Sequence, residues 1–293
     1  MSALKYLLLA SSFAFALCAL SAQAQNNSVR LTPSEVVAGS PELIEVIAPA
    51  DAVLTGDWLD RPLHFFPATD GKRWFALAGV DVSAKPGETE LRIGAKLHSG
   101  ATRDLSTRVK ILAGHYKSGR LSVAPKFVEP PPEAMAEIKA EVELKKRIFA
   151  SSAEDPLWSG NFRVPVTAEP TDSFGTRRTF NGKLASIHQG MDFRAATGTV
   201  IHAGNSGTIV LARKLYYEGN CVVVDHGLGL YTLSMHLSRI DVKEGQQVEK
   251  DQLLGLSGAT GRVTGPHLHW AVRWEGAYLD PAKLLKLDLS RVR

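Results

Sequence analysis

Cysteine and net charge are both scarce in this chain. Two of its 293 residues are cysteines, Cys18 and Cys221, and 34 Lys and Arg stand against 30 Asp and Glu, a formal charge of +4. Cys18 falls within a predicted leader, so the mature chain would keep Cys221 alone and could form no internal disulfide. The charge excess is too small for a nucleic-acid footprint, which needs clustered cations. We therefore expect no nucleic-acid partner and a buried, unreactive Cys221, while the oligomeric state is left open.

Long apolar runs are absent after the first residues. At the N-terminus, Lys5 precedes an apolar stretch that extends to Leu17, and residues 22–24 form an Ala-Gln-Ala cleavage pattern. A membrane anchor is the alternative, but the run is short for a bilayer span and no charge flanks its end. We predict that residues 1–24 are a signal peptide for export across the inner membrane. The mature protein would begin near Gln25, would not span the membrane, and would act in the periplasm or cell envelope.

Short alternating strands dominate residues 26–115. Runs at 43–47 and 73–77 alternate apolar and polar residues, and turn signals separate them. This spacing predicts a small β-sandwich, for which an immunoglobulin-like arrangement is one topology. Three histidines of this region lack the spacing of metal ligands, and we expect them to be solvated: His64, His98 and His115.

A proline-rich and helical linker is predicted for residues 116–158. Three consecutive prolines end the β region, and residues 133–150 have the period of one helix. Within it, Glu141 and Lys145 have the spacing of an i,i+4 ion pair. Mixed charges favour a packed connector over a membrane-binding helix. The predicted apolar stripe of the helix consists of Met135, Ile138 and Val142.

Residues 159–288 are again rich in β-patterns, and frequent glycines mark tight turns between them. No long helical period interrupts these runs, which favours an antiparallel β domain. The whole chain is therefore predicted to be mainly β. The predicted strands of this region are 198–202, 206–213, 220–225, 230–236, 252–256 and 267–274.

Six of the nine histidines lie between His188 and His269. Asp192 follows His188 by four residues, and on a strand His267 and His269 would point to the same face because one residue separates them. Imidazole and carboxylate are zinc ligands, and a catalytic zinc site keeps one position open for a water whose pKa falls to about 7. A structural site made of thiolates is excluded by the cysteine count. A metal bound here would therefore be catalytic.

Three ordered motifs make the C-terminal region resemble the lysostaphin/LytM-type zinc metallopeptidases, which are peptidoglycan endopeptidases. The family's His-x-x-x-Asp motif is matched by His188 and Asp192, and its His-x-His motif by His267 and His269. Between the two, the family has a strand that ends in a further histidine, which is matched by His236.

The resemblance covers residues from about 160 to 285, and it implies a mechanism. Zinc would be held by His188, Asp192 and His269, with His236 and His267 as the catalytic pair without a metal bond. One imidazole would accept a proton and another would stabilise the oxyanion, and the sequence does not assign these parts. The implied substrate is the peptide cross-link of bacterial cell-wall peptidoglycan, with the bond left open. The family's frequent tyrosine upstream of the first motif has no match here.

Other interpretations compete with this one. The main alternative is a catalytically inactive activator or scaffold for other cell-wall hydrolases, but such relatives typically lack ligand residues. A carrier-type hairpin around Lys250 leaves the histidines unexplained, and a serine hydrolase at Ser257 lacks the second glycine of a nucleophile elbow. His202 and His226 are expected to be structural residues of a strand and a turn.

Overall fold

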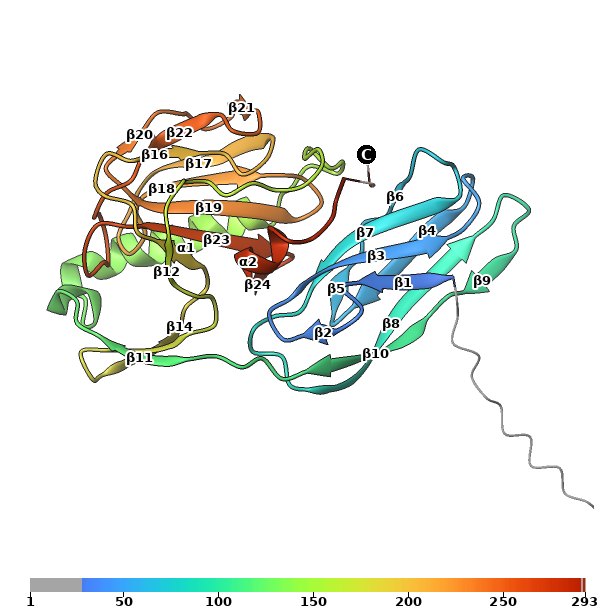
Figure 1. The fold of residues 1–293 in the computed structure, drawn as a ribbon, viewed down its shortest axis with the longest axis horizontal. Helices are drawn as coiled ribbons and strands as arrows, with labels where there is room; N and C mark the ends of the chain where they lie inside the picture. The colour runs from blue at the N-terminus through green and yellow to red at the C-terminus, as the bar shows by residue number, and fades with distance from the viewer. Residues whose placement is uncertain (1–27, 291, 293) are drawn as a thin grey trace, which may run out of the picture.

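The computed structural model describes residues 28–290 and 292 (Figure 1). The predicted signal peptide, residues 1–24, lies outside the described residues. Within the described part the chain is mainly β, which confirms the predicted fold class. No helix in that part is both long enough and apolar enough to cross a lipid bilayer.

Two β-sheets form the N-terminal part of the described chain. One has the strand order β1-β3-β7-β6, and the other has the order β2-β10-β8-β4-β5 with β9 added beside β8. The pairs within both sheets are antiparallel apart from β2 and β10. The strands are β1 (Val29–Thr32), β2 (Val36–Val37), β3 (Pro41–Ile47), β4 (Val53–Trp58), β5 (Arg61–Pro62), β6 (Phe66–Pro67), β7 (Arg73–Gly79), β8 (Gly87–Lys96), β9 (Thr102–Asp104) and β10 (Thr107–Leu112).

Both N-terminal sheets contribute to one hydrophobic core. Val46 and Phe75 come from the first sheet and Leu91 and Ile93 from the second, and all four belong to the same buried cluster. Along β8, residues from Leu91 onward alternate between buried and more exposed positions, because successive side chains of a strand point to opposite faces. This is the period-2 pattern visible in the sequence. The immunoglobulin-like arrangement stays a prediction.

The segment predicted as a linker adds two elements to the C-terminal part. The strand β11 (Ser118–Leu121) pairs in parallel with β13 (Arg177–Phe180). The helix α1 (Met135–Phe149) packs on the large sheet of the C-terminal part through Leu144, Ile148 and Phe149. Two short 3-10 helices lie between them, η1 (Pro125–Phe127) and η2 (Pro132–Ala134).

The predicted apolar stripe of this helix is wrong for two of its three residues, while the third, Ile138, is half-buried. Met135 and Val142 are 39% and 42% exposed, whereas Glu141 is only 8% exposed. The Glu141 carboxylate accepts the backbone N–H of Tyr216, and Lys145 pairs with Glu218 of the same turn and not with Glu141. A backbone N–H in a tight turn needs an acceptor, and this requirement outweighs the helix's own apolar pattern.

The C-terminal part contains one large sheet and two small ones. The large sheet has the order β12-β15-β23-β19-β18-β17-β21 with β24 beside β23, and the small sheets are β11-β13-β14 and β16-β22-β20. The six strands predicted from the sequence are present, with ends shifted by two residues at most. The elements not yet given are β12 (Pro170–Asp172), β14 (Leu184–Ile187), β15 (Met191–Phe193), β16 (Val200–His202), β17 (Gly207–Leu215), β18 (Gly219–Asp225), β19 (Leu230–Leu237), β20 (Arg239–Ile240), β21 (Gln247–Val248), β22 (Leu253–Leu256), β23 (Leu268–Trp274), β24 (Ala277–Leu279) and α2 (Pro281–Leu284).

The two faces of the large sheet bury different clusters. Trp270 and Val272 of β23 join the main core, whereas Ala271 belongs to a second cluster that α1 covers. Cys221 lies in this second cluster as a buried free thiol, as predicted. Since side chains alternate along a strand, His269 shares the face of Ala271. The candidate site therefore lies on the α1 face of the sheet.

The N-terminal and C-terminal parts contact each other directly. A Cβ at Gly79 would come within 2.4 Å of the Leu279 side chain, so the glycine provides the space for this contact. His64 is exposed, as predicted, and its Nε2 lies 3.3 Å from Glu275 Oε1 across the contact. The hydrogen bond to Glu275 raises the pKa of His64.

Candidate metal centre and its cleft

Strand pairing brings Asp192 and His269 side by side. They are directly opposed residues of the β15–β23 ladder, and His269 is in turn opposite Met235 of β19. His188 comes from the loop between β14 and β15, where its backbone N–H donates to the carbonyl of Thr176. Two strands and one loop thus deliver three potential metal ligands to one point.

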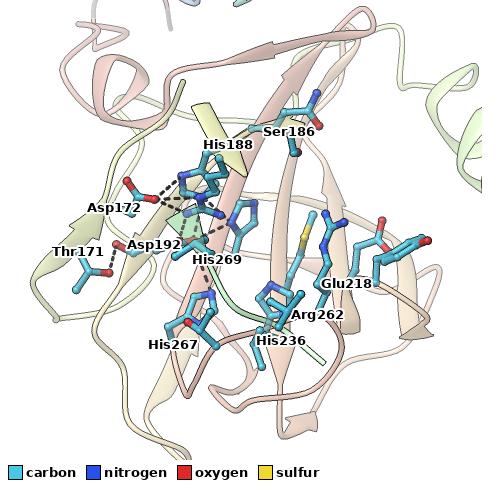
Figure 2. Close-up of a pocket in the computed structure, with 18 of the residues that line it drawn as sticks. Thr171, Asp172, Ser186, His188, Asp192, Glu218, His236, Arg262, His267 and His269 are labelled. Atoms are coloured by element: carbon cyan, nitrogen blue, oxygen red, sulfur yellow. Dashed lines mark hydrogen bonds and ion pairs between the residues drawn. The ribbon is translucent and has the colours of Figure 1, made fainter. Parts of the chain in front are cut away.

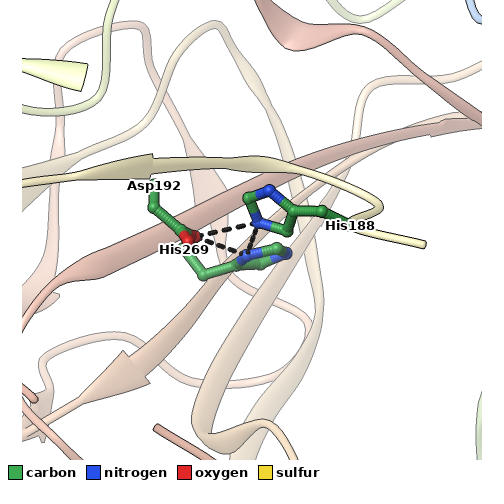
Figure 3. A group of neighbouring side chains, drawn as sticks. All are labelled: His188, Asp192 and His269. Carbon is green, nitrogen blue, oxygen red and sulfur yellow. Dashed lines mark hydrogen bonds and ion pairs between the residues drawn. The ribbon is translucent and has the colours of Figure 1, made fainter. Parts of the chain in front are cut away.

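The three side chains form a compact group (Figure 3). Asp192 Oδ1 lies 3.0 Å from His188 Nε2 and 2.8 Å from His269 Nδ1, and these two nitrogens are 3.0 Å apart. His188 and Asp192 are 3% and 7% exposed. The structure therefore brings together the two imidazoles and the carboxylate that the family resemblance implies as metal ligands.

More lone pairs than protons point into this group. His188 Nδ1 lies 2.9 Å from the carbonyl oxygen of Ser173, which can only accept, so Nδ1 carries the proton and Nε2 of the neutral ring is bare. Asp192 Oδ1 is also an acceptor. Of the three short contacts, a neutral His269 can supply at most one proton, at Nδ1. Converging lone pairs of this kind, with a ring nitrogen fixed by a carbonyl, are the donor set of a cation site.

Two further residues hold the group in place. Arg178 Nη2 donates to Asp192 Oδ2 and to Asp172 Oδ2, each over 2.6 Å, so the other oxygen of Asp192 is left for the group. Gly190 lies against His269, because a Cβ there would come within 2.5 Å of the His269 Nε2 atom. Neither residue was identified from the sequence.

A β-bulge places His236 beside the group. Met235 and His236 of β19 lie opposite the single residue Cys221 of β18. His236 has a φ of 64°, in the left-handed region that residues with a Cβ rarely adopt. Bulges bend a strand and redirect its side chains, and they are frequent next to active sites. In a regular strand without the bulge, His236 would point to the opposite face of the sheet from Met235, away from the group.

His236 and His267 stand next to each other in the same tautomer. Their Nδ1 atoms donate to the carbonyls of Thr260 and Gly265, over 2.9 Å and 2.8 Å. The ring centroids are 4.9 Å apart, and His267 Nε2 lies 3.7 Å from Asp192 Oδ1. Each neutral ring therefore keeps a bare Nε2 that can accept a proton.

Burial and close neighbours shift the pKa values in this group. Burial favours the neutral form of Asp192, but His188 and His269 outweigh it and hold the pKa of Asp192 below its usual range. Burial lowers the pKa of His236 to about 3, and His269 and His267 add to the shift. Burial also lowers the pKa of His269. The imidazoles of His236 and His269 are therefore predominantly neutral at pH 7, the form that can donate a lone pair.

The group opens into a cleft of about 400 Å³ (Figure 2). All five residues singled out in the sequence line it. The cleft is also lined by residues that sequence reasoning missed, among them Leu121, Val123, Arg178, Tyr217 and Arg262.

The sequence profile of peptidase family M23 matches residues 186–281. This span includes β15, β19 and β23 and all five of the residues that converge on the cleft. The chain carries a peptidase family M23 domain.

Relatives of the M23 domain have been found by sequence and by structure. Peptidoglycan DD-endopeptidase ShyA of Vibrio cholerae is 44% identical over 132 residues, which are 44% of this chain and 31% of ShyA. DD-carboxypeptidase/endopeptidase Mpg of Neisseria meningitidis is 37% identical over 98 residues, which are 33% of this chain and 23% of Mpg. The chain thus spans less than a third of the length of these curated relatives.

The structural likeness extends beyond the M23 domain. A crystal structure of a Pseudomonas aeruginosa protein assigned to peptidase M23 has a TM-score of 0.64 and 28% sequence identity, and the match covers 86% of this chain and 95% of that chain. A share of 86% is larger than residues 186–281, so part of the remaining fold is common to both proteins.

One wall of the M23 cleft comes from outside residues 186–281. The backbone of Leu121 and Val123 is clamped by Asn181, whose side chain bonds both the N–H and the carbonyl of Val123 over 2.9 Å. The backbone N–H of Asn181 donates to Leu121, also over 2.9 Å. The Asn-Gly dipeptide at 181–182 is a hairpin signal that could have located the turn, but its clamp on a distant segment has no sequence signature.

The other two histidines of the M23 domain do not line the cleft. His226 is fully buried, with Nδ1 2.7 Å from the Ser206 carbonyl and Nε2 2.8 Å from Thr232 Oγ1, and burial lowers its pKa to about 4. His202 lies on β16. Both positions agree with the structural roles expected for them.

Proposed function

We propose that this chain is a zinc-dependent endopeptidase that hydrolyses peptide cross-links of bacterial cell-wall peptidoglycan. The observation that carries the proposal is the convergence of His188 Nε2, Asp192 Oδ1 and His269 Nδ1 with at most one proton among them. Relatives of its M23 domain are named peptidoglycan DD-endopeptidases, which supports the substrate class.

The donor set fits zinc. Two neutral imidazoles and one carboxylate are ligands that zinc prefers, and three protein ligands leave the fourth position of a catalytic site open. His188, Asp192 and His269 would hold the ion. When bound, zinc supplies Lewis acidity and lowers the pKa of water to about 7. The Ser173 carbonyl orients His188, and Arg178 orients Asp192, so two of the three ligands are held in position.

His236 and His267 would move protons at their Nε2 atoms. A water positioned for attack can pass its proton to a bare Nε2, and the departing amine can take the proton from the same atom. We assign the first acceptance to His267, because its Nε2 lies 3.7 Å from Asp192 Oδ1, beside the group. His236, whose ring packs against His267, would then stabilise the oxyanion that forms on the substrate carbonyl.

The proposed bond and location follow from the relatives and the leader. ShyA and ShyB are named DD-endopeptidases, and we propose the D,D cross-link as the bond that this chain cuts. We propose that residues 1–24 direct export and that the mature enzyme acts in the periplasm or cell envelope. The test is N-terminal sequencing of the protein from fractionated cells. Protein that keeps residues 1–24 and is found in the cytoplasmic fraction would contradict this proposal.

The deciding experiment combines metal content with turnover. The chain purified without its leader is expected to contain stoichiometric zinc by mass spectrometry and to release cross-linked fragments from purified peptidoglycan. Chelation should abolish release and added zinc should restore it. His269→Ala should lose both zinc and turnover, whereas His202→Ala, a histidine outside the cleft, should keep both. Stoichiometric zinc in His269→Ala, or turnover that survives chelation, would contradict the proposal.

The inactive activator or scaffold is disfavoured by the same geometry. Such a protein has no need for a complete set of ligands and two bare Nε2 atoms in one cleft. His188, Asp192 and His269 are all in place, and His236 and His267 both line the cleft. Stoichiometric zinc without turnover on any peptidoglycan would favour the alternative.

A further inference from the structure

Arg262 presents an uncommitted guanidinium in the cleft. Its guanidinium carbon lies 4.8 Å from the ring centroid of Phe180 and 5.0 Å from that of Tyr217. None of residues 28–290 or 292 accepts a hydrogen bond from this group or forms an ion pair with it. Figure 2 shows the side chain on the side of the cleft away from Asp172, with no dashed line to it.

The backbone around Arg262 is held tightly. Its N–H donates to the Tyr217 carbonyl over 2.8 Å. Gly261 before it has a φ of 74°, and a Cβ there would lie 2.4 Å from the backbone nitrogen of Gly219. The loop can therefore approach the β17–β18 turn only with glycine at this position. The β17–β18 turn therefore holds the backbone of Arg262, and two aromatic rings pack against its guanidinium.

The charges near Arg262 are already paired with one another. Arg178 is bound by Asp172 and Asp192. Glu218 also lines the cleft and its charge favours the protonated Arg262, but its Oε1 pairs with Lys145 of α1 and it forms no hydrogen bond or ion pair with the guanidinium. These groups leave Arg262 as a cation with free donors on this side of the cleft.

We propose that Arg262 binds a carboxylate of the peptide substrate. Aromatic rings pack against the guanidinium, and its N–H donors lie in the plane of the group and point outward from its edge. A carboxylate accepts two parallel N–H bonds in that plane, which lysine cannot offer. This inference rests on the proposed function, and it adds the chemical group by which the cleft orients its substrate.

The test compares peptides that differ by one functional group. A synthetic cross-linked stem peptide is prepared with all its carboxylates free and as a series in which each carboxyl in turn is a carboxamide. A charge-assisted bidentate contact corresponds to about a tenfold to hundredfold change. With the wild-type enzyme, we therefore expect one of the carboxamide peptides to have a kcat/KM lower than that of the free-acid peptide by this factor. Arg262→Met should lower the free acid to the level of that amide and change the amide itself less than about twofold.

Two variants separate recognition from structure. Arg262→Lys keeps the charge and the aliphatic stem, and it should lose most of the discrimination because it lacks the planar fork. Arg194→Met removes a second, exposed arginine of the cleft and should leave the acid-to-amide ratio unchanged. The proposal is overturned if the wild type discriminates against no amide, or if both Arg262 variants slow every peptide by the same factor.

A binding readout separates this proposal from the proposed function. In the metal-stripped full chain, the Nε–H resonance of Arg262 should shift on addition of the free-acid peptide and not of the discriminated amide. A shift in the metal-stripped chain, together with no hydrolysis of any peptide by the zinc-containing chain, would refute the endopeptidase proposal alone. Hydrolysis without a shift or discrimination would refute the carboxylate site alone, and neither hydrolysis nor a shift would refute both.

Discussion

Gly190 offers a way to disturb the metal group without touching a ligand. The residue lies between His188 and Asp192, and its Cα faces His269 on the neighbouring strand. A Cβ at this position would lie 2.5 Å from His269 Nε2, 2.6 Å from His269 Cε1 and 2.7 Å from the backbone oxygen of Trp270. The substitution Gly190→Ala therefore requires movement of the imidazole, of the β15–β23 pair, or of both.

The distances set the size of the effect. Ordinary contact with a Cβ begins at 3.4 Å, so the His269 ring must retreat by about 0.9 Å, the difference between 3.4 and 2.5 Å. Metal–ligand distances tolerate only about 0.2 Å. Rotation of the imidazole would relieve only its own contacts with the new Cβ. The Cβ would also lie 2.7 Å from the backbone oxygen of Trp270, so strand β23 must move as well. We expect zinc affinity to fall at least tenfold to a hundredfold, the range seen when support of a metal ligand is lost.

The assay is a competition between the protein and a chromophoric zinc chelator, with turnover on purified peptidoglycan measured in parallel. Gly119→Ala is the matched control, because a Cβ there meets nothing within 4 Å. Thermal unfolding of both variants without metal separates a local effect from general destabilisation. Zinc affinity of Gly190→Ala within about twofold of the wild type would refute the assignment of His269 as a ligand held by this contact.

Two further substitutions test features away from the metal group. Burial raises the pKa of Glu42 to about 8, against the opposing effects of Ser40 and Lys283. The folded state thus holds a proton that the unfolded state releases above pH 4.5, and stability should fall as the pH rises to about 8, by at most roughly 4–5 kcal/mol. Glu42→Gln should abolish this slope in urea unfolding at pH 5.5 and 8.5, and parallel pH profiles would contradict it. Asn181→Gly keeps the positive φ but removes the clamp on Val123, so we expect a loss of about 1–3 kcal/mol and a higher KM on peptidoglycan, with Asn181→Asp closer to wild type. An unchanged KM would show that this wall does not contact the substrate.

Much of this protein was predictable from local pattern. The strands of the C-terminal part followed from alternating apolar runs between glycines, because burial of one face imposes a period of two residues. The spacing of His267 and His269 predicted that these two imidazoles would share a face, and the family resemblance implied that His188, Asp192 and His269 would meet at one metal. The structure places these residues and His236 around one cleft, as expected.

Helix α1 shows where local pattern failed. Its apolar residues predicted one buried face, yet Glu141 is buried and Met135 exposed, because the turn after β17 presents a backbone N–H that needs an acceptor. Glu141 and Tyr216 lie 75 positions apart, and no periodicity links them.

The sequence by itself therefore determined which chemistry is available to this protein, through the residue types and their spacing in three short motifs. The tertiary structure decided how that chemistry is arranged. Pairing of β15 with β23 sets Asp192 against His269, the bulge in β19 turns His236 into the cleft, and the parallel strand β11 supplies a wall from outside the M23 domain. The physical reason is that spacing controls the direction of a side chain along its own strand, whereas the neighbours across a sheet are selected by the packing of the whole chain.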